Sequence, residues 1–224
     1  MNNPHTTLRL LLVDDHTLVR EALRTRLDAE IDLQVVGSVA NADDAIRTAR
    51  EHQPDIVIMD IDMPGRLSFD AARDICSERP ETHLVFLSSF THDRYIQDAL
   101  KAKAIAYLTK DEPPATLISA LRGAARGIAY FSPAVRKRLV IGKGARITLQ
   151  GASDTPTRIS TLTNRELEML RYLARGMSKK EIAQTIGRSY NTVDSHCEKL
   201  MKKLDIHDRV ELARFAIREG LAEA

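Results

Sequence analysis

The chain is poor in the residues that mark secreted and membrane proteins. Its 224 residues contain no tryptophan, 4% aromatic residues and only two cysteines, Cys76 and Cys197. A small secreted domain needs a denser set of cysteines, and the wide spacing of these two favours reduced thiols over a disulfide. No apolar run approaches membrane-spanning length, and the opening Met-Asn-Asn-Pro-His-Thr-Thr lacks a signal-peptide pattern. We therefore expect a cytoplasmic protein without a membrane partner.

The small net charge of +2 hides an uneven distribution. Residues 1–130 contain 15 Lys and Arg against 20 Asp and Glu, whereas residues 131–224 contain 18 against 11. An acidic half joined to a basic half predicts two domains, the second with a polyanion as its partner. We expect one domain over residues 1–130, a linker over 131–157 and a second domain over 158–224.

Apolar runs alternate with amphipathic stretches throughout the first half. The runs predict strands over Leu8–Val13, Gln34–Ser38, Ile56–Met59, Leu84–Leu87 and Ile105–Leu108. The stretches predict helices over Leu18–Leu27, Ala42–Arg50, Phe69–Glu78, Tyr95–Ala102 and Ala115–Arg126. This alternation predicts an α/β fold, a doubly wound five-stranded parallel sheet with helices on both faces.

Chemically active side chains recur where the predicted strands end. Asp14 and Asp15 close the first strand, Asp60 the third and Ser88 the fourth, and Lys110 stands just past the fifth. In a parallel sheet these ends share one edge, where ligands bind. Three carboxylates gathered there raise one another's pKa, so the site needs a divalent cation. Helix capping is the alternative role of Asp14 and Asp15, whereas Asp60 follows a buried run in which an unpaired carboxylate is costly.

The second half has only helical patterns. Gly176 and Gly187 separate short helices, which suits an all-α helix-turn-helix; the alternative is a helical bundle that only dimerises. Helix starts are predicted at the pairs Thr163–Glu166 and Ser178–Glu181, at Ser189 or Asn191, and at Asp208. An excess of lysine and a third helix that opens with hydroxyl groups favour DNA as the partner.

Several motifs of the first half occur together in one order. They are Asp14-Asp15, Asp60 in DIVIMDIDMPG, Ser88 in LVFLSSF and Lys110 in AYLTKD. In these motifs, residues 8–127 resemble the flavodoxin-like receiver domain of bacterial two-component response regulators. The resemblance implies that Asp60 accepts a phosphoryl group, which Ser88 and Lys110 contact. It also implies that Mg²⁺ is held by Asp14, Asp15 and Asp60 and by the carbonyl of Asp62.

The same resemblance gives Tyr107 a role in switching. Tyr107 would rotate as Ser88 moves toward the phosphoryl group, although a packed core tyrosine is an equally good interpretation. Ser68, Lys103 and Ala106 stand where the family often has glycine. These departures affect loop and backbone freedom and leave the acidic residues in place.

The second half is similar to the LuxR-type helix-turn-helix of the NarL/FixJ class. The similarity spans residues 162–221 and includes Leu-Thr-x-Arg-Glu, Lys-Glu-Ile-Ala and Thr-Val-x-x-His. It implies that the helix Ser189–Leu204 enters the major groove and that the helix Asp208–Glu219 supports dimer contacts. The residues expected at DNA are Lys180, Arg188, Ser189, Asn191, Thr192, Asp194, Ser195, Glu198, Lys199 and Lys202.

Two acidic residues and one histidine lie on the helix expected in the major groove. Asp194 takes a place where lysine is common, and Glu198 lies four residues later on the same helix face. Their charges predict either an unusual target sequence, since a carboxylate accepts a hydrogen bond from cytosine, or weak DNA binding. His196 has no Cys or His at metal-ligand spacing, so we expect it to pack or to contact phosphate.

Together these features predict a response regulator, not an enzyme beyond slow self-phosphorylation and dephosphorylation. We expect a sensor histidine kinase to phosphorylate Asp60 with Mg²⁺, and a homodimer to bind double-stranded promoter DNA. One rival is a protein-interaction switch that no longer binds DNA. The other is an aspartate-nucleophile phosphatase, in which Asp60 and Asp62 form the nucleophile–acid pair.

Overall fold

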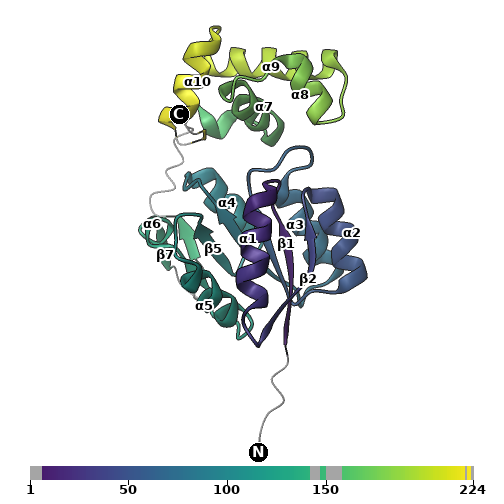
Figure 1. Ribbon diagram of the computed structural model, residues 1–224. Coiled ribbons are helices and arrows are strands. Elements are labelled where there is room, and N and C mark those ends of the chain that lie inside the picture. The colour runs from purple at the N-terminus through teal and green to yellow at the C-terminus, as the bar shows by residue number, and fades with distance from the viewer. Residues whose placement is uncertain (1–6, 142–146, 150–157, 220, 223–224) are drawn as a thin grey trace, which may run out of the picture. The chain divides into compact units, whose positions relative to one another are not determined.

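The computed structural model describes residues 7–141, 147–149, 158–219 and 221–222. The chain forms two compact units that divide near residue 148. The first contains a sheet with flanking helices and the second is mainly helical (Figure 1). The predicted linker, residues 131–157, lies partly outside the described residues. Its described part includes a short helix, α6 (Pro133–Arg136), and a two-stranded sheet of β7 (Leu139–Ile141) and β8 (Ile147–Leu149).

The sheet of the first unit is parallel throughout, with strand order β2-β1-β3-β4-β5-β6. Its strands are β1 (Leu8–Val13), β2 (Leu33–Val39), β3 (Ile56–Asp60), β4 (His83–Ser88), β5 (Ala106–Thr109) and β6 (Tyr130–Phe131). The five predicted strands are confirmed. The sixth, β6, was missed because two residues are too few to show a hydrophobic period.

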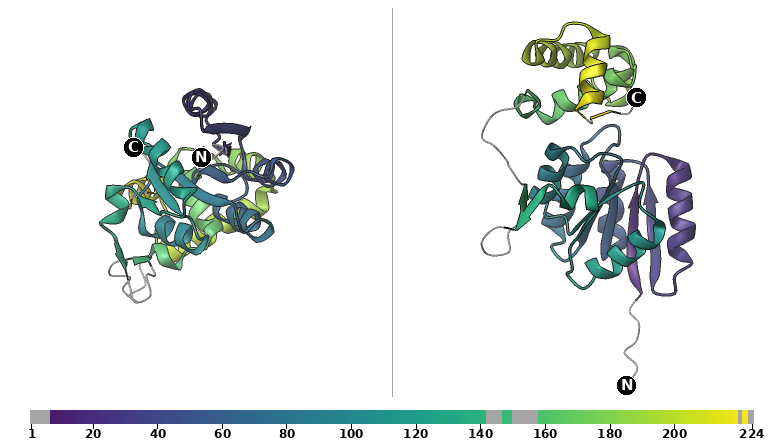
Figure 2. Two further views of the ribbon diagram at one scale, coloured as in Figure 1. Left: turned by 90° about the horizontal axis from the view of Figure 1, so that it is seen from below. Right: turned by 90° about the vertical axis from the view of Figure 1, so that its left-hand side faces the viewer.

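Helices cover both faces of this sheet, as predicted (Figures 1 and 2). They are α1 (Thr17–Asp28), α2 (Ala42–His52), α3 (Ser68–Glu78), α4 (Asp93–Lys101) and α5 (Pro114–Ala124). On one face, Leu27 of α1 and Leu121 of α5 join Leu10 in a buried core. On the other, Phe69 of α3 packs on Phe86 of β4 with ring centroids 5.0 Å apart. Burial on both faces explains why the strands are nearly continuous apolar runs.

The second unit is a helical bundle around its own core. It contains α7 (Asn164–Ala174), α8 (Lys179–Thr185), α9 (Tyr190–Leu204) and α10 (Arg209–Arg218). The two predicted capping boxes, Thr163–Glu166 and Ser178–Glu181, are present, and Ser189 and Asp208 cap the next two helices. These caps satisfy backbone N–H groups that a helix start leaves without partners. They fix where each helix of the helix-turn-helix begins.

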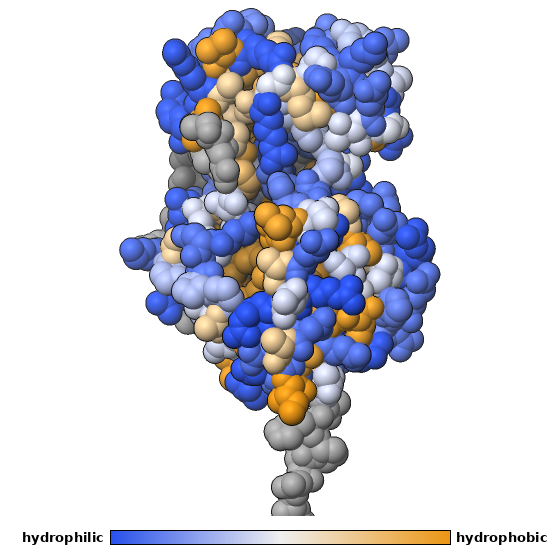
Figure 3. Space-filling view, viewed as in Figure 1, coloured by the Kyte–Doolittle hydropathy of each residue, from blue (hydrophilic) through white to orange (hydrophobic). Residues whose placement is uncertain are grey.

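The surface is mostly polar, with small apolar patches on the face shown in Figure 3. Ile31 (98% exposed) and Leu18 (80% exposed), at the two ends of the α1 region, are the most exposed of the large apolar residues that the structure describes. None of the described helices combines the length and the apolar composition that crossing a lipid bilayer requires.

Two leucines of α1 provide a matched test of this core. Leu27 is 1% exposed, whereas Leu18 is 80% exposed. We expect Leu27→Ala to lower the free energy of unfolding of the first unit by about 2–5 kcal/mol, because it removes buried methyl groups and leaves a cavity. Leu18→Ala should change it by less than about 0.5 kcal/mol. Urea unfolding followed by circular dichroism measures both, and equal losses would contradict the assigned core.

Candidate functional site

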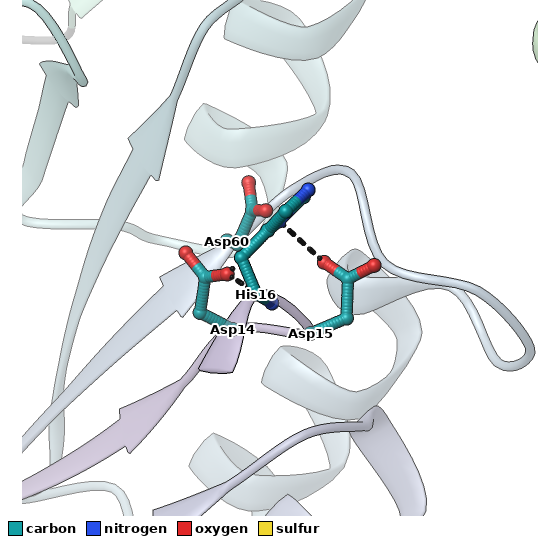
Figure 4. Close-up of side chains that lie close together, drawn as sticks. All are labelled: Asp14, Asp15, His16 and Asp60. Carbon is teal, nitrogen blue, oxygen red and sulfur yellow. Dashed lines mark hydrogen bonds and ion pairs between the residues drawn. The ribbon is translucent and has the colours of Figure 1, made fainter. Parts of the chain in front are cut away.

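The acidic site forms where β1 and β3 end side by side. Asp60 is the last residue of β3 and Asp14 follows β1, and these residues are 2% and 4% exposed. Asp15 and His16 complete a group whose possible metal-ligand atoms all lie within 4.8 Å of one another. Figure 4 shows the four side chains converging at the strand ends. The parallel register of β1 and β3 therefore brings together residues that are 46 positions apart.

Lys110 links the two buried carboxylates. Its Nζ lies 2.8 Å from Oδ2 of Asp14 and 2.8 Å from Oδ2 of Asp60. Lys110 reaches them because it follows β5, where its backbone N–H donates to the carbonyl of Ser88 at 3.0 Å. One ammonium thus balances part of the negative charge of three carboxylates.

Burial and charge act in opposite directions on this group. Burial raises the pKa of Asp60 above its ordinary value, although the charge and hydrogen bond of Lys110 pull it down. For Lys110, burial alone lowers the pKa, but the charge of Asp60 and hydrogen bonds to Asp14 and Asp60 outweigh it and raise the pKa. The ammonium therefore stays charged, and the carboxylates remain short of positive charge.

Asp15 and His16 lie at the open side of the site. Oδ1 of Asp15 is buried and accepts no hydrogen bond from the described residues. It lies 3.1 Å from Nδ1 of His16, whose ring carries a charge only when the imidazole is protonated. The backbone N–H of His16 donates to Oδ1 of Asp14 at 2.8 Å. His16 was not predicted as part of the site, although its place directly after Asp14-Asp15 was a usable signal.

The loop after β3 places a further predicted residue. The backbone N–H of Asp62 donates to Oδ1 of Asp60 at 3.1 Å, and Gly65 turns the chain with a φ of 90°. Ser68, where the family often has glycine, is 1% exposed and donates to the carbonyl of Ile61 at 3.0 Å. Lys103, another such position, has a φ of 59°, which explains why glycine is common there.

Ser88 and Tyr107 join neighbouring strands to the loop after β4. Oγ of Ser88, which is fully buried, accepts a hydrogen bond from the backbone N–H of Phe90 at 3.0 Å. The hydroxyl of Tyr107 donates to the carbonyl of Phe90 at 2.6 Å. Burial raises the pKa of Tyr107, so its hydroxyl remains a donor. Tyr107 is thus packed in the core and bonded to the same loop as Ser88, an arrangement consistent with either predicted role.

The helix α9 presents a polar face to solvent. Val193, Cys197 and Leu200 are fully buried on its inner side. The outer side and the approach to the helix hold the residues predicted at DNA, all exposed except the half-buried Asp194: Lys180, Arg188, Ser189, Asn191, Thr192, Ser195, Glu198, Lys199 and Lys202.

Two of the residues predicted at DNA also form contacts within the second unit. Asp194 forms an ion pair with Lys179 at the start of α8, so its charge is balanced within the second unit. Ser189 accepts a hydrogen bond from the backbone N–H of Thr192 at 3.2 Å and thereby caps the helix. The Lys179–Asp194 pair was not predicted, because it joins residues 15 positions apart on two helices.

Two family models match this chain, one for each unit. Residues 10–122 match the response regulator receiver domain, and residues 160–216 match the bacterial regulatory proteins of the luxR family. A receiver followed by such a helix-turn-helix defines a class of transcription regulators. The chain belongs to the two-component response regulators of the NarL/FixJ class, with a DNA-binding LuxR-type helix-turn-helix.

Known relatives align over almost the whole chain. The uncharacterized transcriptional regulatory protein YxjL of Bacillus subtilis (strain 168) is 35% identical over 216 residues, which cover 96% of this chain and 98% of YxjL. The oxygen regulatory protein NreC of Staphylococcus carnosus (strain TM300) is 32% identical over 217 residues, which cover 96% and 100%. The similarity therefore includes both units.

Solved structures share the fold. A LuxR-family two-component response regulator from Aurantimonas is 33% identical with a TM-score of 0.56, covering 58% of this chain and 94% of that one. The RcsB response regulator of Salmonella typhimurium has a TM-score of 0.69 at 20% identity, covering 96% and 99%.

Replacing Lys110 tests the electrostatic balance of the site. In Lys110→Met the buried Asp60 loses its nearest positive charge, so we expect its pKa to rise further. Titration of the ¹³C-labelled Asp60 carboxyl by NMR, without divalent cations, measures this shift. Lys101→Met, which removes the partner of Asp98 on α4, is the control and should leave the Asp60 titration unchanged. A lowered or unchanged Asp60 pKa in Lys110→Met would contradict the described balance.

Proposed function

We propose that Asp60 accepts a phosphoryl group from a sensor histidine kinase and that this modification controls promoter binding by the helix-turn-helix. The main support for this proposal is the buried Asp60 carboxylate, which lies 2.8 Å from the Lys110 ammonium and beside two further aspartates. A buried carboxylate at a strand end, whose negative charge is only partly balanced, is typical of a reactive site. It fits a reaction in which a charged group is added and removed.

The donors at the site suit Mg²⁺. This ion prefers carboxylate, carbonyl and water oxygens. Asp15 offers a buried oxygen that accepts no hydrogen bond from the described residues. Asp15 and Asp60 would hold the ion with the carbonyl of Asp62, and Asp14 would assist directly or through water. When bound, Mg²⁺ would offset the charge of the phosphoryl oxygens, a role that one ammonium fills only in part.

The protein's own residues then have separate tasks. A carboxylate oxygen of Asp60 attacks the phosphorus of the phosphohistidine, an acyl phosphate bond forms, and the P–N bond to the departing imidazole breaks. Lys110 keeps its charge beside the transferred group and stabilises it, since phosphoryl transfer depends mainly on positioning and electrostatics. The Ser88 hydroxyl, at the next strand end, would donate a hydrogen bond to a phosphoryl oxygen.

The signal would leave the site through the loop after β4. Ser88 and Tyr107 both bond to Phe90 of this loop, so a shift of Ser88 toward a phosphoryl group disturbs the loop and the start of α4. Phosphorylation changes an equilibrium only through its different affinity for two conformations. We propose that the favoured conformation forms a homodimer whose helix-turn-helix units bind DNA.

Different observations support the two proposed partners, promoter DNA and the sensor kinase. RcsB of Salmonella enterica serovar Typhimurium has been solved bound to the rprA promoter with the phosphomimetic BeF₃⁻. A further solved structure contains two RcsB dimers bound to two parallel DNAs. The exposed polar face of α9 suits a similar role in this chain. For the kinase, we propose docking on α1 beside the acidic site, where Leu18 exposes an apolar side chain. A regulator of this kind works in the cytoplasm, where it meets both partners.

A second candidate function is a phosphorylation-dependent protein-interaction switch. It is favoured by Glu198, which is exposed on the outer side of α9 and forms no ion pair with the described residues. An unbalanced carboxylate at that position repels phosphate oxygens. A phosphatase that uses Asp60 and Asp62 is the third candidate, and it requires the Asp62 side chain to act on a substrate.

One pair of variants separates these candidates. We expect Asp60→Asn to lose incorporation of acid-labile phosphate from acetyl phosphate, because an amide is not a nucleophile for phosphorus. Asp62→Asn keeps the backbone carbonyl and N–H, so it should still be labelled. Labelling is measured with radioactive donor, and DNA binding by gel shift on the gene's own upstream region with and without donor.

The outcomes differ for each candidate. Our proposal predicts salt-dependent DNA binding that the donor strengthens in the wild type and in Asp62→Asn but not in Asp60→Asn. Labelling that persists in Asp60→Asn would show that the phosphoacceptor is another residue. Steady hydrolysis of a phosphomonoester that stops in Asp62→Asn would favour the phosphatase, and absent DNA binding in every state would favour the interaction switch.

A further inference from the structure

The helix-turn-helix unit contains a cavity of about 200 Å³ beside α9. It is lined by Arg165, Ile186, Arg188, Thr192 and His196. Arg165 comes from the first turn of α7, Ile186 ends α8 and Arg188 lies in the turn before α9. Thr192 and His196 are one turn apart on α9. Three helices and one turn thus bring their side chains together around one space.

The lining has the chemistry of an anion site. Two guanidinium groups, one imidazole and one hydroxyl surround the cavity, and Ile186 is the one apolar residue among the described residues that line it. A guanidinium presents several N–H donors in a planar fork, which matches the oxygens of a phosphate group. The described residues that line the cavity include no carboxylate.

The two arginines are held differently. Arg165 donates to Oε2 of Glu168 at 2.6 Å, and Glu168 is 4% exposed, so this guanidinium is anchored from behind. Arg188 is exposed and forms no ion pair with the residues that the structure describes. One fixed and one free guanidinium at the same cavity suit an anion that arrives from solvent.

The position of the cavity indicates which anion. Thr192 and His196 lie on one flank of α9, and Lys199 follows on the same flank. Asp194 and Glu198 occupy the opposite flank, while Ser195 lies between the two on the outer side. Lys179 balances Asp194, so the acidic charge left on that flank is that of Glu198, which forms no ion pair with the described residues. This distribution favours a DNA phosphate on the flank of the cavity.

We propose that this cavity binds one phosphodiester of the DNA backbone and fixes how α9 lies in the groove. This inference rests on the proposed DNA binding. It adds Arg165 to the DNA-contacting residues, and it favours phosphate contact over packing for His196. Phosphate contacts position a protein on DNA while base contacts specify the sequence. The cavity then determines on which strand α9 is anchored, and Glu198 faces away from that strand.

Backbone neutralisation in the DNA tests this proposal on the full-length chain. A duplex is selected from random sequences by the wild type treated with acetyl phosphate, and each backbone phosphate is replaced in turn by a neutral methylphosphonate. We expect a loss of affinity of about tenfold at one position per half-site. In Arg165→Gln and Arg188→Gln that position-specific loss should disappear, and the slope of log K against log salt should fall by about one per half-site.

The controls separate a contact from a change in folding or overall charge. Arg175→Gln removes an exposed charge of the same unit outside both the cavity and the helix expected at the dimer contact, so its methylphosphonate profile should match the wild type. Arg188→Lys should restore part of the loss. Circular dichroism and thermal unfolding establish that each variant is folded, and Arg188→Gln carries the test if Arg165→Gln is not.

Each other outcome overturns the proposal in a recognisable way. A methylphosphonate loss that persists in both arginine variants would show that another residue holds that phosphate. If inorganic phosphate perturbs the NMR signals of His196 while no methylphosphonate position depends on the arginines, the cavity binds a free anion instead. If the wild type selects no duplex, the proposed DNA binding itself fails, and the backbone assignment fails with it.

Discussion

The structure of the first unit depends on one electrostatic contact, the Lys110 ammonium held between the buried carboxylates of Asp14 and Asp60. Each N–O distance is 2.8 Å, and the two carboxylates come from strands that pair only in the folded sheet. Carboxylates with so little exposure are costly unless they are paired. Lys110 offsets part of that cost, and the deficit that remains attracts a cation and makes the site sensitive to added charge.

A short series of hydrogen bonds connects Lys110 to the loop after β4. The backbone of Lys110 bonds to that of Ser88, and Ser88 and Tyr107 both bond to Phe90. A phosphoryl group that contacts Lys110 and Ser88 would therefore affect the loop after β4 directly, without a rearrangement of the core. Negative charge is also only partly balanced in the second unit, because Lys179 pairs with Asp194 while Glu198 has no partner among the described residues.

Much of the fold follows from local patterns in the sequence. Continuous apolar runs predicted five strands, and capping residues such as Thr163 and Ser189 predicted helix starts, because both depend on neighbours in sequence. Asp14, Asp60 and Lys110 were predicted to meet because parallel strands end at one edge. His16, the Lys179–Asp194 pair and the cavity at Arg165 were not predicted, since they depend on side-chain directions and on packing between helices. Strand β6 was missed because two residues carry no period.

The family match establishes what kind of regulator the chain is. The proposed mechanism depends on the position of Asp60 beside Lys110. The most direct test is a crystal structure of the full chain grown with Mg²⁺ and beryllofluoride. We expect BeF₃⁻ on a carboxylate oxygen of Asp60, Mg²⁺ coordinated by Asp15 and the carbonyl of Asp62, and Lys110 in contact with a fluorine. An adduct on a different side chain, or an Asp60 that stays unmodified with Lys110 still bound to both carboxylates, would contradict the proposed mechanism.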